Sequence, residues 1–255
     1  MSAKRIAVTA GSEISTKTAL RLAEERFRGS VCLSDGSEGG RDLYDAVFYL
    51  ETADAPKLPG IEKWIGNPHL RVAESPDELM AEIAFFLGIP EPLEIERKYL
   101  IGYPDIGMLK EDPLCRRVEI SQTYLEDGEG SYRVRKRGAD GDYLYYLTRK
   151  KKLGGITRSE IEERITEEEY LDHLNRGAKP LKTVSKDRYC LLYKNKYFEI
   201  DVFPFWNDKA LMEIELRSED EKAELPPQIK VIRDVSSEKE YTNKAIAEKL
   251  AAQKQ

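Results

Sequence analysis

The sequence contains few of the residues that build disulfide frameworks or zinc sites, with three cysteines and two histidines among 255 residues. Cys32, Cys115 and Cys190 are odd in number and far apart, and none belongs to a Cys-x-x-Cys motif or a Cys/His cluster. This spacing excludes a disulfide framework and a structural zinc site. We therefore expect a protein of a reducing compartment, the cytoplasm.

Long apolar runs are also missing. No stretch approaches the length that spans a membrane, and the N-terminus has no signal-peptide pattern, so we expect neither secretion nor a membrane partner. The formal net charge of −6 argues against general nucleic-acid binding. At 40% hydrophobic and 35% charged residues, the chain can build one large domain or two small ones, with a real core.

The chain changes character near residues 88–92. Before this point strand and helix patterns alternate, with strands expected at 5–10, 45–51 and 69–72 and a helix at 17–27. Ser75 and Pro76 then open a second helix, as N-cap and first-turn proline. We therefore expect a small α/β domain at residues 1–90 and a different domain at residues 91–255.

The second part is rich in strands. Turn signals such as Lys194-Asn195 separate several of them, and helices are expected at 166–176 and 237–255. Many antiparallel strands with few helices predict a closed barrel within an α+β fold. The strands are expected at 94–101, 118–126, 131–138, 142–152, 158–165, 182–193, 196–203, 211–217 and 230–235.

Glu94, Glu96 and Lys98 stand at alternate positions of the first of these strands. Side chains of a strand alternate between its faces, so the three share one face. Two close carboxylates repel each other unless a hard cation such as Mg²⁺ or Mn²⁺ compensates, and a lysine beside them can hold a phosphate oxygen. The trio suggests a site for a metal-bound phosphate.

Charges repeat at every second residue on other strands too. Such alternation is usual on the solvated face of a half-exposed strand. Here clusters of one sign recur on many strands, which is costly between neighbours unless something offsets the charge. We therefore favour a barrel whose charged faces line a tunnel and whose apolar faces pack under helices. The repeats are Arg133/Arg135/Arg137, Thr148/Lys150, Arg158/Glu160/Glu162/Arg164, Lys186/Arg188, Glu199/Asp201 and Glu213/Glu215.

Residues 92 to about 250 resemble a CYTH domain of the triphosphate tunnel metalloenzyme superfamily. The resemblance rests on an ordered series of motifs rather than on Glu-x-Glu-x-Lys alone. The series comprises Glu94-x-Glu96-x-Lys98, Arg133-x-Arg135, Thr148-Arg149-Lys150, Arg158-x-Glu160-x-Glu162, Lys186-Asp187-Arg188-Tyr189, Glu199-Ile200-Asp201-Val202-Phe203, Glu213-Ile214-Glu215-Leu216 and Tyr241-Thr242-Asn243.

This resemblance implies an eight-stranded antiparallel β-barrel tunnel with flanking helices, which binds a triphosphate together with Mg²⁺ or Mn²⁺. It implies metal ligands at Glu94, Glu96, Glu213 and Glu215, with Glu160, Glu162 and Asp201 completing a second ion's shell or positioning water. It implies phosphate-binding residues at Lys98, Arg133, Arg135, Lys150, Lys186 and Arg188. The catalytic set would be Glu94, Glu96, Lys98, Glu160, Glu162 and Lys186, with no role for His69 or His173.

Residues 4–90 resemble a shortened, degenerate P-loop domain of the AAA type. Residues 5–11 and 17–20 stand where a strand, a phosphate loop and a helix would lie. A working loop reads Gly-x-x-x-x-Gly-Lys-Ser/Thr, but Thr16 replaces its second glycine and Glu13 places a carboxylate where phosphates would sit. We expect a scaffold or a dimerisation module, which allows a homodimer.

The function expected on these grounds is metal-dependent hydrolysis of a small triphosphate, with inorganic triphosphate as the leading substrate. Phosphoryl transfer needs mainly positioning and charge stabilisation, which charged walls supply. Two alternatives remain: an adenylate cyclase of class IV type, and a non-catalytic polyphosphate-binding module.

Overall fold

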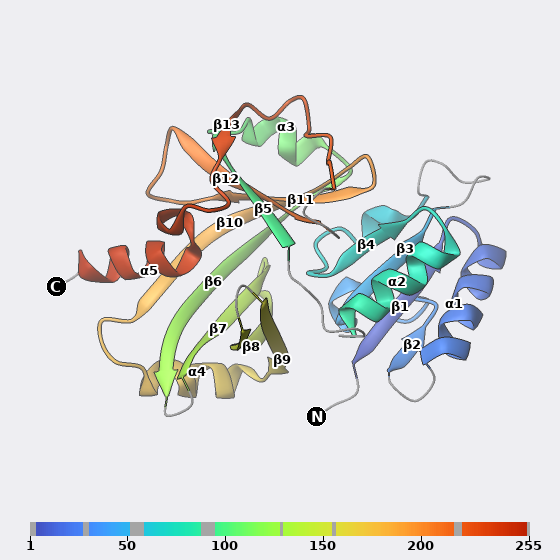
Figure 1. Cartoon of the computed structure of the whole chain (residues 1–255), viewed down its shortest axis with the longest axis horizontal. Helices are drawn as coiled ribbons and strands as arrows, with labels where there is room; N and C mark the ends of the chain where they lie inside the picture. The colour runs from blue at the N-terminus through green and yellow to red at the C-terminus, as the bar shows by residue number, and fades with distance from the viewer. Residues whose placement is uncertain are drawn as a thin grey trace.

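The computed structural model describes residues 4–27, 31–51, 59–87, 95–127, 130–154, 157–216 and 221–253. These residues form two sheets (Figure 1). We call residues 4–87 the α/β unit and residues 95–253 the antiparallel unit. The predicted boundary at residues 90/91 lies outside the described residues. No helix in the described ranges has the length and apolar character needed to cross a membrane.

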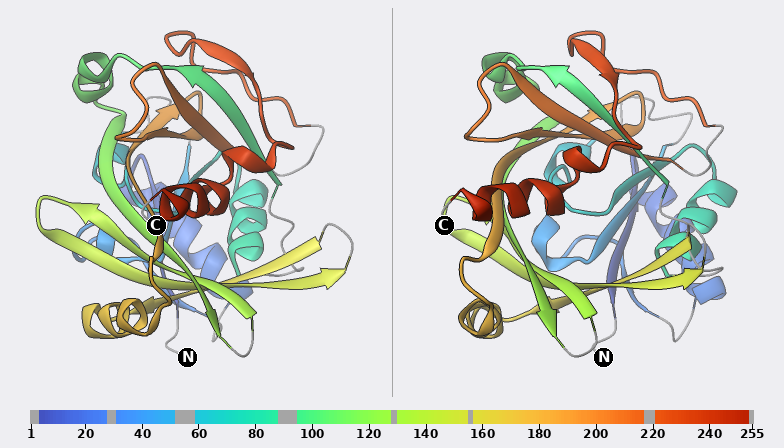
Figure 2. Two further views of the ribbon diagram at one scale, coloured as in Figure 1. Left: turned by 90° about the vertical axis from the view of Figure 1, so that its left-hand side faces the viewer. Right: turned by 60° about the vertical axis from the view of Figure 1, so that its left-hand side comes forward.

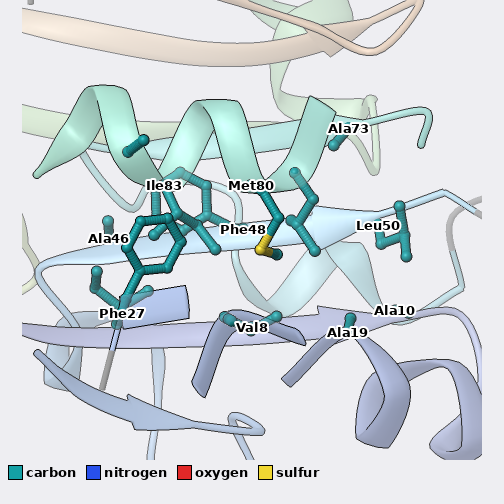
Figure 3. Close-up of a cluster of buried hydrophobic side chains, with 14 residues drawn as sticks. Val8, Ala10, Ala19, Phe27, Ala46, Phe48, Leu50, Ala73, Met80 and Ile83 are labelled. Carbon is teal, nitrogen blue, oxygen red and sulfur yellow. The ribbon is translucent and has the colours of Figure 1, made fainter. Parts of the chain in front are cut away.

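The α/β unit contains a parallel sheet of four strands, β1 (Arg5–Ala10), β2 (Cys32–Ser34), β3 (Ala46–Leu50) and β4 (Leu70–Ala73), in the order β2-β1-β3-β4. β2 was not predicted. Helices α1 (Glu13–Phe27) and α2 (Pro76–Phe86) cover one face, where Phe27, Phe48 and Ile83 meet in a buried cluster (Figure 3). Short 3₁₀ turns lie at Arg41–Leu43 and Ile61–Lys63.

The other face of this sheet packs on the antiparallel unit. Parallel strands are apolar on both faces and need a cover on each. Trp64 and Ile65, beside the sheet, share one buried cluster with Val118, Ile120 and Cys190 of the antiparallel unit. The molecule therefore has three layers: the helices α1 and α2, the small sheet, and the large sheet (Figure 1).

The large sheet confirms the predicted strands. Its hydrogen-bonded order is β13-β5-β12-β11-β10-β6-β7-β8-β9, and every pair is antiparallel. That is nine strands within the described residues, and barrel closure remains a prediction. The strands are β5 (Ile95–Gly102), β6 (Cys115–Asp127), β7 (Gly130–Ala139), β8 (Asp142–Gly154), β9 (Thr157–Ile165), β10 (Lys182–Tyr193), β11 (Lys196–Val202), β12 (Lys209–Leu216) and β13 (Val231–Asp234).

Two tight turns hold neighbouring strands in register. Lys194 and Asn195 join β10 to β11 with φ of 46° and 59°, the left-handed pair that a two-residue hairpin turn requires. At the β7–β8 turn, a Cβ on Gly138 would lie 1.9 Å from the carbonyl oxygen of Asp142, so only glycine allows this approach.

Helices cover the outside of the large sheet and one end of its concave face. α3 (Ile106–Glu111), which was not predicted, and α4 (Glu167–Arg176), which begins at a Thr166–Glu169 capping box, pack on the outer face. The C-terminal helix α5 (Asn243–Ala252), capped by Thr242, lies on the concave side (Figure 2). It begins later than the predicted residue 237, after a 3₁₀ turn at Lys239–Tyr241.

Candidate active site on the charged face of the large sheet

The alternating charges share one face of the large sheet. In the strand register Lys98 stands opposite Glu213, Glu213 opposite Glu199, and Asp201 opposite Arg188. The apolar residues between them, such as Ile200 and Met212, belong to the buried cluster on the other face. The charges of β5 and β10–β12 therefore share one face, and the apolar residues between them on β11 and β12 pack on the other face; a charged tunnel stays a prediction.

β5 and β12 form an acidic wall around one lysine. Lys98 Nζ lies 3.0 Å from Glu96 Oε1 and 2.9 Å from Glu213 Oε1. Burial alone would lower the pKa of Lys98, but Glu213 and Glu96 outweigh burial and raise it. Burial opposes ionisation of Glu213 too, yet Lys98 and Arg188 hold its pKa below the usual range. Lys98 and Glu213 are therefore charged together.

β10 and β11 carry a second group of charges around Asp201, which is fully buried. Arg188 donates to Asp201 twice, from Nε at 2.6 Å and from Nη2 at 2.7 Å, and it also contacts Glu213 and Glu199. Lys186 forms an ion pair with Asp201 and donates to Asn243 Oδ1, 3.0 Å away at the start of α5. Burial, and then Arg188, lowers the pKa of Lys186.

β7 forms a basic wall facing β9. Arg133 Nη2 and Arg135 Nη1 lie 3.8 and 3.7 Å from the same Glu162 oxygen, which also accepts a 2.9 Å hydrogen bond from Thr148. Burial and the neighbouring Arg133 lower the pKa of Arg135, whose Nε has no hydrogen-bond partner in the described structure. A buried guanidinium with a spare donor is a binding element for an anion.

Two side chains of the α/β unit reach this face. His69 Nε2 lies 3.6 Å from Glu162 Oε1, and Arg71 on β4 forms an ion pair with Glu215 on β12. Neither residue was predicted for the site. Their contacts depend on how the two sheets pack, which residue spacing does not reveal.

Comparison with known proteins identifies the family to which the antiparallel unit belongs. A model of the CYTH domain matches residues 92–248. The chain belongs to the CYTH domain family. An inorganic triphosphatase of Nitrosomonas europaea is 35% identical over 159 residues, which cover 60% of this chain and 96% of the relative.

Solved structures resemble the same part of the chain. The crystal structure of an inorganic triphosphatase is 27% identical and has a TM-score of 0.39, covering 60% of this chain and 93% of that chain. A putative adenylate cyclase from Bacillus halodurans is 16% identical and has a TM-score of 0.32, covering 50% of this chain and 82% of that chain.

The carboxylates of the charged face fit a hard divalent cation. Their oxygens are the ligands that Mg²⁺ and Mn²⁺ prefer. The ion pairs of Arg71, Lys98, Lys186 and Arg188 join these four cations to six carboxylates. Among the described residues no three side chains already form a ligand set. The six carboxylates are Glu82, Glu96, Glu199, Asp201, Glu213 and Glu215.

All ten predicted site residues whose side chains are described come together here. Glu94 lies outside the described residues, as do the side chains of Lys150 and Glu160, whose backbones pair between β8 and β9. The sequence reasoning left Arg137 out of the site, although it continues the alternation of β7. Arg137 is buried, and its Nη1 has no hydrogen-bond partner in the described part of the chain. Those brought together are Glu96, Lys98, Arg133, Arg135, Glu162, Lys186, Arg188, Asp201, Glu213 and Glu215.

The segment that resembles a P-loop uses its polar groups internally. Lys17 Nζ lies 2.6 Å from Glu13 Oε1 on the exposed surface of α1. The backbone N–H of Ala10 donates to Thr16 Oγ1 at 2.9 Å. The relationship of this segment to P-loop domains remains a prediction.

Proposed function

We propose that this protein is a divalent-metal-dependent triphosphatase and that inorganic triphosphate is its substrate. In this proposal the curved large sheet encloses the charged face as an eight-stranded tunnel. The observation that carries the proposal is the pairing of an acidic wall on β5 and β12 with a basic wall on β7. A metal-bound polyphosphate presents the positive charge of the metal and the negative charge of the phosphates. It therefore matches the acidic wall and the basic wall together.

The cationic residues would bind and orient the phosphate chain. Lys98, Lys186 and Arg188 are each held by carboxylates, so they are positioned before substrate arrives. Arg133 and Arg135 share one carboxylate at distances beyond a hydrogen bond, so phosphate oxygens would gain the stronger contacts. Lys150 would add to this wall.

Glu94, Glu96, Glu213 and Glu215 would hold the metal ion, with Glu160, Glu162 and Asp201 positioning water or completing a second ion's shell. When bound, such an ion neutralises developing charge on phosphate oxygens and lowers the pKa of a water molecule. Glu96 is ion-paired with Lys98, and it stands opposite Glu215 across β5 and β12. This like-charged register pair is where a cation would relieve the most repulsion.

The choice of inorganic triphosphate is supported by the relative's name, because charged walls recognise phosphates rather than the group attached to them. The test is product release from inorganic triphosphate, thiamine triphosphate, ATP and GTP, each with Mg²⁺ and with Mn²⁺. We expect orthophosphate, released fastest from inorganic triphosphate.

Two results of this test would refute the proposal. Cyclic AMP from ATP, without orthophosphate from triphosphate, would identify a cyclase. Tight triphosphate binding without turnover under either ion would identify a binding module.

A further inference from the structure

β4 and the residue before it bring two side chains of the α/β unit to carboxylates of the charged face. His69, just before β4, and Arg71, within β4, are two residues apart, and each contacts a carboxylate of the large sheet. The partner of His69 is on β9, at one edge of the sheet order, and that of Arg71 is on β12, near the other edge. β4 therefore bridges strands from opposite sides of the curved sheet.

Arg71 also lines the cavity that contains the acidic wall. This cavity of about 80 Å³ lies between the two units, and its walls include Glu96, Glu199, Glu213 and Glu215. The Arg71 guanidinium lies between Glu215 and Glu82 on α2, whose Oε2 is 3.9 Å from Arg71 Nε. The side chain is 21% exposed, so it is largely withdrawn from solvent.

Arg71 lies at one end of the row of charged side chains that lines the cavity. On β12, Leu211 packs in the cluster with α5, Glu213 contacts Lys98 and Arg188, and Glu215 contacts Arg71. Successive inward residues of a strand are about 7 Å apart, at roughly 3.4 Å per residue. A phosphate chain bound by the cations at the level of Glu213 would therefore meet Arg71 at its end facing the α/β unit.

Guanidinium chemistry suits that position. Its five N–H donors form a planar fork that binds phosphate through two oxygens at once. A divalent ion on Glu96, Glu213 and Glu215 would neutralise the carboxylate that now pairs with Arg71. Glu82 and the Leu70 carbonyl oxygen, which accepts a 3.0 Å hydrogen bond from Arg71 Nη1, would still hold the guanidinium at the cavity wall. Nη2, which now pairs with Glu215, would be available to the substrate.

We propose that Arg71 binds the end phosphate of the triphosphate, so that the α/β unit supplies part of the substrate site. The inference rests on the proposed function. It also specifies the substrate class as a phosphate chain whose end toward the α/β unit carries no organic group, because Arg71 and the apolar cluster around Trp64 and Ile120 occupy that side.

The test compares Arg71→Ala and Arg71→Lys with the wild-type chain, using two measurements of opposite expected sign. With saturating Mn²⁺, Arg71→Ala should raise the KM for triphosphate on the order of 10-fold to 100-fold with kcat little changed, and Arg71→Lys should raise it less. Without triphosphate, Mn²⁺ should bind Arg71→Ala at least as tightly as wild type in an electron paramagnetic resonance titration, because a competing positive charge is gone. Arg21→Ala, on the surface of α1, is the matched control.

An unchanged KM in Arg71→Ala would overturn the inference. So would a higher KM accompanied by weaker Mn²⁺ binding and a lower unfolding midpoint, because that pattern means that Arg71 only holds the two units together. If wild type hydrolyses no triphosphate, the proposed function fails separately. In that case calorimetry measures the affinity of wild type and of Arg71→Ala for triphosphate. Equal affinities would refute the inference.

Discussion

Asp201 is the carboxylate on which the buried charges of β10 depend most. It is fully buried and accepts two hydrogen bonds from Arg188 as well as the ion pair from Lys186. Asparagine has nearly the same shape, so Asp201→Asn removes the charge with little change of volume. We predict that this substitution destabilises the full chain strongly.

The expected loss follows from the partners that remain. Removing one member of a buried ion pair costs about 3–5 kcal/mol, because the other charge stays buried without compensation. Arg188 would keep Glu199 and Glu213, whereas Lys186 would keep only the Asn243 oxygen among the contacts described above. Since most of the compensation for Arg188 survives, we expect the lower end of that range, about 3 kcal/mol.

Urea unfolding of the full chain, followed by circular dichroism, measures this loss. The matched control is Asp172→Asn, because Asp172 is half-exposed and pairs with Arg176 on the surface of α4 at 2.5 Å. An exposed pair of this kind contributes at most about 1 kcal/mol. Added triphosphate should restore part of the stability of Asp201→Asn by supplying negative charge. If Asp201→Asn loses no more stability than Asp172→Asn, the reasoning about the buried charges is wrong.

Two further predictions concern thiols and a turn. Cys32 is exposed, whereas burial raises the pKa of Cys115 to about 12 and also raises that of Cys190, so both stay protonated and unreactive. Ellman's reagent at about pH 8 should therefore detect one thiol in the folded chain and all three in denaturant. Gly138→Ala should lower the free energy of unfolding by about 1–3 kcal/mol, because its Cβ would meet a carbonyl oxygen at 1.9 Å. Gly40→Ala, with open space around the new Cβ, should change it by less than about 0.5 kcal/mol in the same urea assay.

The strands of the antiparallel unit could be predicted because local patterns determine them. Alternation with period two marked each strand, and Lys194-Asn195 marked a turn that the structure places between β10 and β11. The inward direction of the charges was predictable for a different reason. Carboxylates such as Glu199 and Glu213, opposite each other on neighbouring strands, repel unless cations lie among them, and Arg188 contacts both.

Short elements and contacts between the units were beyond sequence reasoning. α3 has six residues, too few for a helical period to emerge. α1 begins at Glu13 rather than at the predicted residue 17. At this earlier start, Ser12 Oγ accepts a 3.2 Å hydrogen bond from the N–H of Ser15. His69 and Arg71 reach the site only because the small sheet packs on the large one, and nothing in their own spacing indicates this.

The most direct test of the central claim is orthophosphate release from inorganic triphosphate by wild type and Glu96→Gln, measured with Mn²⁺ and after its removal by EDTA. Glu96 pairs with Lys98 in the acidic wall, and glutamine keeps its size without its charge. We expect wild type to lose turnover in EDTA and regain it with added Mn²⁺, and Glu96→Gln to show none with an unchanged circular dichroism spectrum. Equal release by both proteins, or release by wild type that persists in EDTA, would contradict the claim.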